Sequence, residues 1–163
     1  MEIESESGKK TDDIGFLQKK DGEIHFGRRD INSVENSLDL NFNIDNYKYL
    51  SLRFRNFWST ANYDNVLFSL KNDGMRELTD HSKLDFDPNT NFNLWNLDLN
   101  FDWWFSPGST ITLQYKNQIF NRDNESGLKY YKSLKNLFEF PFEHQLSLRI
   151  NYLIDFNKLR RND

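Results

Sequence analysis

The stretch Trp95-Asn96-Leu97-Asp98-Leu99-Asn100-Phe101-Asp102-Trp103-Trp104-Phe105 alternates apolar and polar residues almost without interruption. Its odd positions carry large apolar side chains, and its even positions carry Asn or Asp as far as Asp102. Successive side chains of a β-strand point to opposite faces, so one face is expected to be apolar and the other acidic and amide-bearing. No helical period sorts these residues as cleanly, and the stretch therefore predicts a strand.

The residues that follow predict a hairpin. Residues 111–119 alternate in the same way, and Ser106-Pro107-Gly108 supplies the proline and glycine of a tight turn. When the apolar side chains are required to share one face, Asp98 lies opposite Lys116. Opposite charges across two strands support this register, although such a pair contributes only ~0.2–1 kcal/mol.

A second hairpin is predicted upstream. Residues 34–45 and 47–58 alternate on either side of a turn near Asp45-Asn46, and the same requirement places Asp39 opposite Arg53. Residues 145–156 form the last alternating segment. Together these segments predict an all-β fold, an antiparallel up-and-down meander of about five long strands.

The connections between these strands differ in length. The tight turns contrast with the long polar stretches 59–92 and 121–143, the second of which has the apolar spacing of a short amphipathic helix. The residues that set this spacing are Leu128, Tyr131, Leu134, Lys135 and Phe138. Residues 14–26 resemble a smaller hairpin around Lys19-Lys20-Asp21-Gly22. We expect a disordered segment over 1–11, one partial β-barrel domain over 12–157 and a tail over 158–163.

The composition excludes several classes of protein. Aromatic residues make up 16% of the chain, which a disordered protein would lack, and no apolar run reaches the ~18 residues of a transmembrane helix. The net charge of −4 and the pI near 5.4 give no basic footprint, so no nucleic acid partner is expected. The chain has no cysteine for disulfides, thiolate metal sites or thiol catalysis.

Catalytic and metal-binding patterns are equally weak. The three histidines are far apart in sequence, and Asp85, Asp87 and Asn89 match only the opening of a calcium loop. Asp98 and Asp102 lie four residues apart on one strand face, about 13 Å at ~3.3 Å per residue, which is too far for a glycosidase pair. We therefore expect no enzyme, no cofactor and no metal site.

Three features favour a membrane wall over a soluble sheet. A transmembrane strand of ~9–11 residues carries aromatic girdles at both ends, and Trp95 and Trp103 flank two leucines at this spacing. Short turns alternate with long loops, as in outer-membrane barrels. The final strand ends in an aromatic, and Ile154 and Phe156 resemble a barrel assembly signal. We therefore predict long transmembrane-type strands, a short extramembrane hairpin and a periplasmic C-terminus.

The two faces of the strands receive different assignments. The predicted lipid-facing residues are Trp95, Leu97, Leu99, Phe101, Trp103, Leu113, Tyr115, Leu148, Ile150 and Tyr152. The predicted lumen-facing residues are Asp39, Arg53, Arg55, Asp98, Asp102, Lys116 and Arg149. These charges either pair and plug the lumen or form a selectivity lining for anionic solutes, and mixed signs favour pairing. The alternative is a soluble β-barrel or sandwich that binds glycans or other ligands through its aromatic face.

Several separated motifs resemble one known family. They are Phe26-Gly27-Arg28-Arg29-Asp30, Val34-Glu35-Asn36-Ser37-Leu38, Leu50-Ser51-Leu52-Arg53-Phe54-Arg55 with Trp58, Phe105-Ser106-Pro107-Gly108-Ser109 with Leu113 and Lys116-Asn117, Leu146-Ser147-Leu148-Arg149, and Tyr152-Leu153-Ile154-Asp155-Phe156. In this order they resemble the outer-membrane barrel family known as domain of unknown function 5916, over about residues 14–160. The resemblance implies a partial outer-membrane β-barrel and a carbohydrate-binding family 9-like domain ahead of it.

The resemblance also bears on partners and completeness. It implies contact with outer-membrane lipid and with the barrel assembly machinery. Five strands fall below the ~8 of the smallest closed barrel, and an open edge in lipid leaves unpaired backbone groups. Residues 1–10 carry no apolar segment of a secretory signal. We therefore expect a fragment of a longer protein, or one part of a split barrel, whose missing N-terminal strands complete the wall in a structural or transport-related role.

Overall fold

The computed structural model describes residues 1–154, and its long strands form one open antiparallel sheet. The elements are β1 (Glu2–Lys20), β2 (Glu23–Asp45), β3 (Lys48–Leu70), β4 (Arg76–Asp80), the 3-10 helix η1 (His81–Lys83), β5 (Thr90–Ser106), β6 (Ser109–Asp123), α1 (Tyr130–Leu137) and β7 (Glu143–Asn151). The strand order is β1-β2-β3-β5-β6-β7, with the short β4 beside β3. The predicted antiparallel meander of long strands is confirmed.

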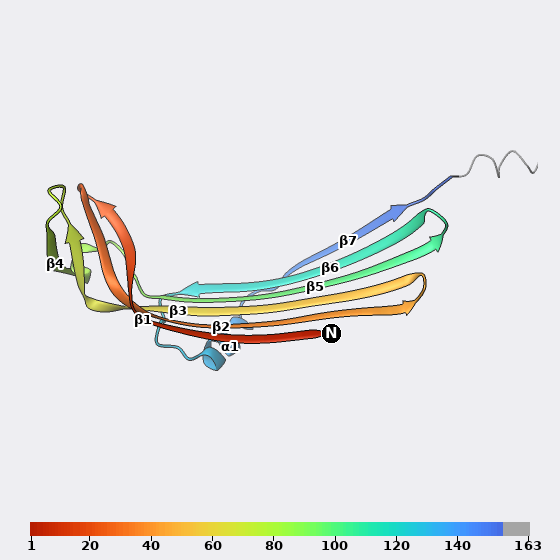
Figure 1. Ribbon diagram of the computed structural model, residues 1–163, viewed down its shortest axis with the longest axis horizontal. Coiled ribbons are helices and arrows are strands. Elements are labelled where there is room, and N and C mark those ends of the chain that lie inside the picture. Colours follow the sequence, from red (N-terminus) through yellow and green to blue (C-terminus); the bar gives the residue numbers. More distant parts are fainter. Residues whose placement is uncertain (155–163) are drawn as a thin grey trace, which may run out of the picture.

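The sheet is long and bent at one end. The β2–β3 and β5–β6 turns lie together at one end, while the far parts of β1, β2 and β3 turn away from the line of the sheet together with β4 (Figure 1). The bend coincides with register shifts between Lys10 and Asp13 in β1 and between Gly27 and Arg29 in β2. Bulges of this kind re-aim a strand and increase its local twist.

The register agrees with the expectation from alternating side chains. Asp98 pairs with Lys116 across β5 and β6, and Asp39 pairs with Arg53 across β2 and β3. A slip of one residue would move every side chain of a strand to the other face, so these pairs fix which residues share a face. The turn between β5 and β6 contains Gly108 at a φ of 71°, where a side chain would be strained.

The N-terminal segment differs from the prediction. Residues 1–11 were expected to be disordered, yet β1 begins at Glu2 and pairs with β2 from Glu2 opposite Asp39 to Lys10 opposite Ile31. Most side chains of this segment are polar on both faces, so it shows no apolar alternation, and its order comes from pairing with β2. The small hairpin expected over 14–26 is likewise the far end of β1 and β2.

The first long connection is also shorter than predicted. Residues 59–92 were expected to be a loop, but β3 continues to Leu70, β4 pairs back onto it and β5 begins at Thr90. The structure therefore has six long strands and one short strand where about five and a separate hairpin were expected. At the other end, β7 stops at Asn151, so the strand predicted over 145–156 is shorter among the described residues.

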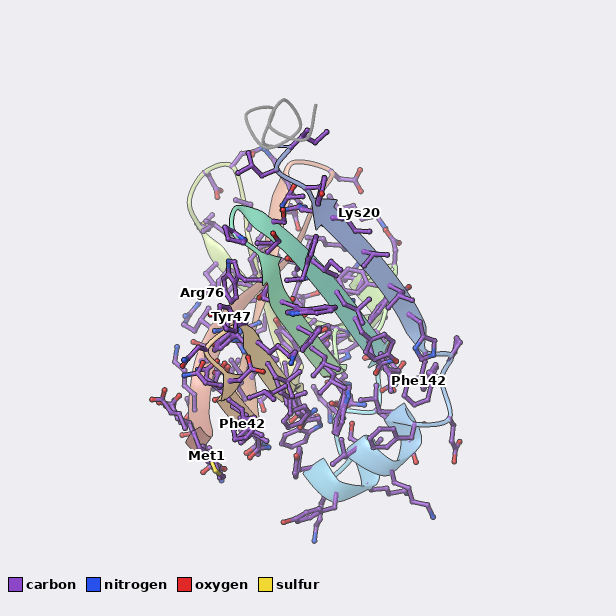
Figure 2. The ribbon with its side chains drawn as sticks, turned by 90° about the vertical axis from the view of Figure 1, so that its right-hand side faces the viewer. Met1, Lys20, Phe42, Tyr47, Arg76 and Phe142 are labelled. Atoms are coloured by element: carbon purple, nitrogen blue, oxygen red, sulfur yellow. The ribbon has the colours of Figure 1, made fainter. Side chains whose placement is uncertain are left out.

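The second long connection contains the predicted helix. α1 spans Tyr130–Leu137 and buries Ser133 and Leu137 against the sheet, where its neighbours are β5 and β6. Met1 and Phe142, which precede the edge strands β1 and β7, lie at opposite edges of the sheet (Figure 2). Within residues 1–154 no helix is long and apolar enough to cross a membrane.

Candidate functional site

The sheet brings one row of apolar side chains from each of the strands β2, β3, β5, β6 and β7 onto a single face, which we call the apolar face. Leu99 of β5 pairs with Leu52 of β3 on one side and with Tyr115 of β6 on the other. The face is built from Leu38, Leu40, Phe42, Leu50, Leu52, Phe54, Trp95, Leu97, Leu99, Phe101, Trp103, Ile111, Leu113, Tyr115, Leu146, Leu148 and Ile150. All of these positions follow from the strand register and the period of two.

Much of this face is uncovered. In β7 the exposed fractions of Leu146, Leu148 and Ile150 are 71%, 61% and 59%. Few of the large apolar residues of the described chain are fully buried, and those that are lie away from the middle of the face, among them Trp58, Leu67, Ile119 and Leu137. Contiguous exposed apolar patches beyond a few hundred Å² are rare on soluble monomers and mark a surface that is covered by a partner or by lipid.

The opposite face is polar and carries three cross-strand ion pairs. The Nε atom of Arg53 lies 2.7 Å from Oδ1 of Asp39, and Lys116 Nζ lies 3.7 Å from Oδ1 of Asp98. Arg55 pairs with Glu35 at 3.3 Å. The first two pairs line a shallow depression of about 420 Å³ across β2, β3, β5 and β6. Opposite charges therefore offset each other in the middle of this face.

The residues predicted for two environments lie on two faces of one sheet. The ten positions expected to face lipid include nine on the apolar face, and Tyr152, just after β7, stacks on Phe105 at 6.2 Å. The seven positions expected to face a lumen all lie on the polar face, where Asp102 accepts a hydrogen bond from Thr112 at 2.6 Å. The faces themselves are observed. Their contact with lipid and with a lumen remains a prediction.

The predicted assembly signal is only partly described. Ile154 is 53% exposed at the end of the described chain, and Phe156 lies outside the described residues. Within residues 1–154 no group of three His, Asp or Glu side chains could hold a metal ion. His25 and His144 are held in separate parts of the sheet, 25 in the bent end and 144 in the edge strand β7.

Sequence reasoning missed a buried polar network at one end of the apolar face. There the apolar positions are replaced by Asn36, Asn56, Asn91 and Asn93, which we call the asparagine cluster. Asn56, Asn91 and Asn93 have exposed fractions of 1%, 1% and 0%. Asn56 donates to Asn93 Oδ1 at 3.0 Å and to the Leu94 carbonyl at 2.9 Å. The cluster thus links β2, β3 and β5.

Helix α1 covers this cluster and completes its hydrogen bonds. The Tyr130 hydroxyl donates to Asn56 at 2.8 Å and accepts from Asn36 at 2.9 Å, while the Ser133 hydroxyl donates to Asn91 at 3.0 Å. Asn93 in turn donates to Ser133 at 3.2 Å. Buried amides without such partners would each cost ~1–3 kcal/mol, so the sequence of the cluster requires the helix.

Burial also affects the acid–base state of the helix. Removal of Tyr130 from water raises the pKa of its phenol, and the neighbouring Tyr131 acts in the same direction. The hydroxyl therefore stays protonated at neutral pH and can donate to Asn56. Trp58 packs against the Tyr130 ring at 5.8 Å and donates its indole N–H to Asn91 at 3.0 Å.

Comparison with known proteins identifies the family. The family model described as "Domain of unknown function (DUF5916)" matches residues 1–162. The chain belongs to this family. Among curated proteins and among solved structures, no match was found.

Two of the motifs that resemble the family lie where the backbone turns or where two strands pack closely. Residues 105–109 form the turn between β5 and β6, in which Ser109 is fully buried and accepts a hydrogen bond from the Leu153 amide at 3.0 Å. Gly27 packs so close to β3 that an added Cβ would lie 2.7 Å from Leu67 Cδ2. One motif thus forms the tight turn at one end of the sheet, and the other allows the close packing of β2 on β3 at the bent end.

Proposed function

We propose that this chain is a section of the wall of an outer-membrane β-barrel, with the apolar face toward lipid and the polar face toward the lumen. The observation that carries the proposal is the uncovered apolar face, which extends across the five strands β2, β3, β5, β6 and β7 in matching register. From Trp95 to Trp103 it spans eight steps of ~3.3 Å, about 20 Å when tilted by ~40°, close to the ~25 Å apolar band of barrel proteins.

The arrangement of turns supports an orientation. The tight turns at Asn46-Tyr47 and Pro107-Gly108 lie at one end of the sheet, and the connections that contain β4 and α1 lie at the other. Barrel proteins keep short turns in the periplasm and long loops outside. The described end of β7 then lies on the periplasmic side, where the assembly machinery would bind the residues that follow Asn151.

The two edge strands of the sheet indicate that further strands are required. Among the described residues, β1 and β7 each pair with a strand on one side only. Unpaired backbone groups in lipid cost several kcal/mol each, so the wall would be completed by further strands beside both edges. The family resemblance extends the proposal to a structural or transport-related role in surface glycan use, next to a carbohydrate-binding family 9-like domain.

Cell fractionation tests this function. The full chain is expressed with a secretion signal, and the membrane fraction is washed with alkaline carbonate and then extracted with detergent. We expect the chain to resist the carbonate wash and to be released only by detergent. Recovery as a monodisperse soluble protein without detergent would contradict the proposal and would favour the soluble, glycan-binding alternative.

A further inference from the structure

The exposed side of α1 combines lysines with aromatic rings. Lys129, at the N-cap, and Lys132 and Lys135 within the helix are all exposed, and residues 128–138 contain no carboxylate. Within residues 1–154 none of the three lysines lies within ion-pair distance of an acidic side chain. The described part of the chain therefore does not neutralise these charges, unlike those of the polar face.

The aromatic rings connect the helix to the apolar face. Phe138 at the C-cap packs edge-on against Trp95 with ring centroids 5.1 Å apart, and Phe142 lies 6.3 Å from Phe138. Phe138, Phe142 and Tyr131 are 43%, 43% and 81% exposed. Trp95 is the last large apolar residue of its row before the asparagine cluster, so the rings continue the apolar face to its boundary.

The asparagine cluster fixes the helix at this boundary. Through Tyr130 and Ser133 the helix is hydrogen-bonded to three strands on the same face that carries the leucines. A helix with aromatic residues beside the apolar zone and lysines on its outer side has the pattern of an interfacial helix. Such a helix lies at the depth of the lipid head groups.

We propose that α1 is a binding surface for the phosphate-bearing head groups of the outer-leaflet lipid, with Lys132 and Lys135 as the phosphate ligands and Phe138 and Phe142 against the acyl chains. This inference rests on the proposed function, because it takes the apolar face to be in lipid. Lysine binds phosphate as a compact charge, and each lysine near an anionic membrane surface strengthens binding roughly fivefold at low salt.

One acidic residue opposes this role and provides an internal test. Glu139 lies two residues after the end of the helix and is exposed, in the same short segment as Lys135. Its carboxylate would repel a phosphate. Neutralisation of Glu139 should therefore strengthen lipid binding, whereas neutralisation of the two lysines should weaken it.

Hydrogen exchange in vesicles tests the inference. The full chain is refolded into phosphatidylcholine vesicles with or without 20 mol% lipid A, a composition of about one anionic lipid in five. Exchange of the α1 amides is then followed by mass spectrometry. For the unaltered chain we expect lipid A to slow exchange in 130–137 by roughly 25-fold, the product of two fivefold effects.

The variants separate a phosphate site from a general effect of charge. In the double variant K132Q/K135Q the slowing by lipid A should disappear, and in E139Q it should increase. The matched control K19Q/K83Q removes two exposed lysines from the bent end of the sheet and should behave like the unaltered chain. Equal slowing by lipid A in K132Q/K135Q would overturn the assignment.

Three further outcomes distinguish which part of the inference fails. If the chain enters phosphatidylcholine vesicles but lipid A leaves α1 exchange unchanged, the head-group site is wrong and the membrane wall stands. If inorganic phosphate at equal concentration slows α1 exchange as strongly as lipid A, the ligand is free phosphate and the lipid assignment is overturned. If the chain enters neither type of vesicle, the proposed function fails and the inference fails with it.

Discussion

The two ends of the apolar face obey the same alternation but carry different chemistry. Near the tight turns the odd positions of β5 carry the half-buried Leu97, Leu99 and Phe101, whereas beyond Trp95 the odd positions carry Asn93 and Asn91 under α1. A row of apolar side chains can be covered by any nonpolar surroundings, because it has no hydrogen bonds to satisfy. A row of buried amides needs defined partners, and the chain supplies them with a helix.

The largest expected effect comes from a charge in the apolar row. Leu99→Arg should destabilise the membrane-inserted form by ~2–4 kcal/mol, because a guanidinium near the bilayer midplane must be desolvated. The measurement is urea-dependent folding of the full chain in phosphatidylcholine vesicles. Asn100→Arg, one residue away on the polar face and between Asp98 and Asp102, is the matched control and should cost little. Equal effects at both positions would show that the two faces meet the same solvent.

A change in the asparagine cluster should act mainly on the helix. Asn56→Leu removes the acceptor of the Tyr130 hydroxyl and the donor to Asn93, which should cost about 1–3 kcal/mol. We expect faster hydrogen exchange in residues 130–137 and little change in the centres of β5 and β6. Ser51→Ala on the polar face is the control, since its hydroxyl accepts only a long bond of 3.5 Å from Asn100. Unchanged exchange in α1 would argue against the cluster as its anchor.

The Tyr130 hydroxyl gives a smaller effect and a pH signature. Tyr130→Phe should cost about 0.5–1.5 kcal/mol for the lost hydrogen bonds. Because the folded pKa of Tyr130 is raised, its stabilising effect is complete below the pKa of the unfolded chain, about 10, and is lost as the pH rises through the folded value. The free energy of unfolding in urea should therefore fall as the pH rises beyond about 10, and this fall should be smaller in Tyr130→Phe. An equal fall in the variant would assign the pH dependence to another group.

The smallest effect is expected on the polar face. Asp98 and Lys116 pair across β5 and β6, but both side chains are partly exposed, at 35% and 47%. A double-mutant cycle with Asp98→Asn and Lys116→Gln should give a coupling energy below about 1 kcal/mol, reduced further by salt. A coupling of several kcal/mol would indicate a desolvated pair and a closed lumen at this position.

Alternation predicted the part of the fold in which one face is apolar. The register of Asp39 with Arg53 and of Asp98 with Lys116 followed because only one alignment keeps the leucines together. The lengths of the strands were underestimated where they continue beyond the apolar residues. Residues 2–10 and 59–70 pair with neighbours but carry polar side chains on both faces over much of their length, so period two left no signal there.

The sequence predicted which residues form the apolar and polar faces, but it did not predict the asparagine cluster at the end of the apolar face. Asparagines in a strand resemble loop or surface residues in sequence, and only the sheet shows that Asn56 and Asn93 are neighbours beneath Ser133. The apolar spacing predicted α1 itself, but not its hydrogen bonds. One usable signal was present, because Asn91 and Asn93 continue the parity of the leucines where a continued strand would bury them.

Single-cysteine labelling at two adjacent residues tests the central claim most directly. The chain has no cysteine, so Leu99→Cys and Asn100→Cys can each carry one fluorophore in otherwise unaltered protein. After reconstitution in vesicles, the label at 99 should be quenched by spin-labelled acyl chains and shielded from aqueous iodide, and the label at 100 should show the reverse. Equal access of iodide to both labels, with no quenching from the acyl chains, would contradict the assignment of the apolar face to lipid.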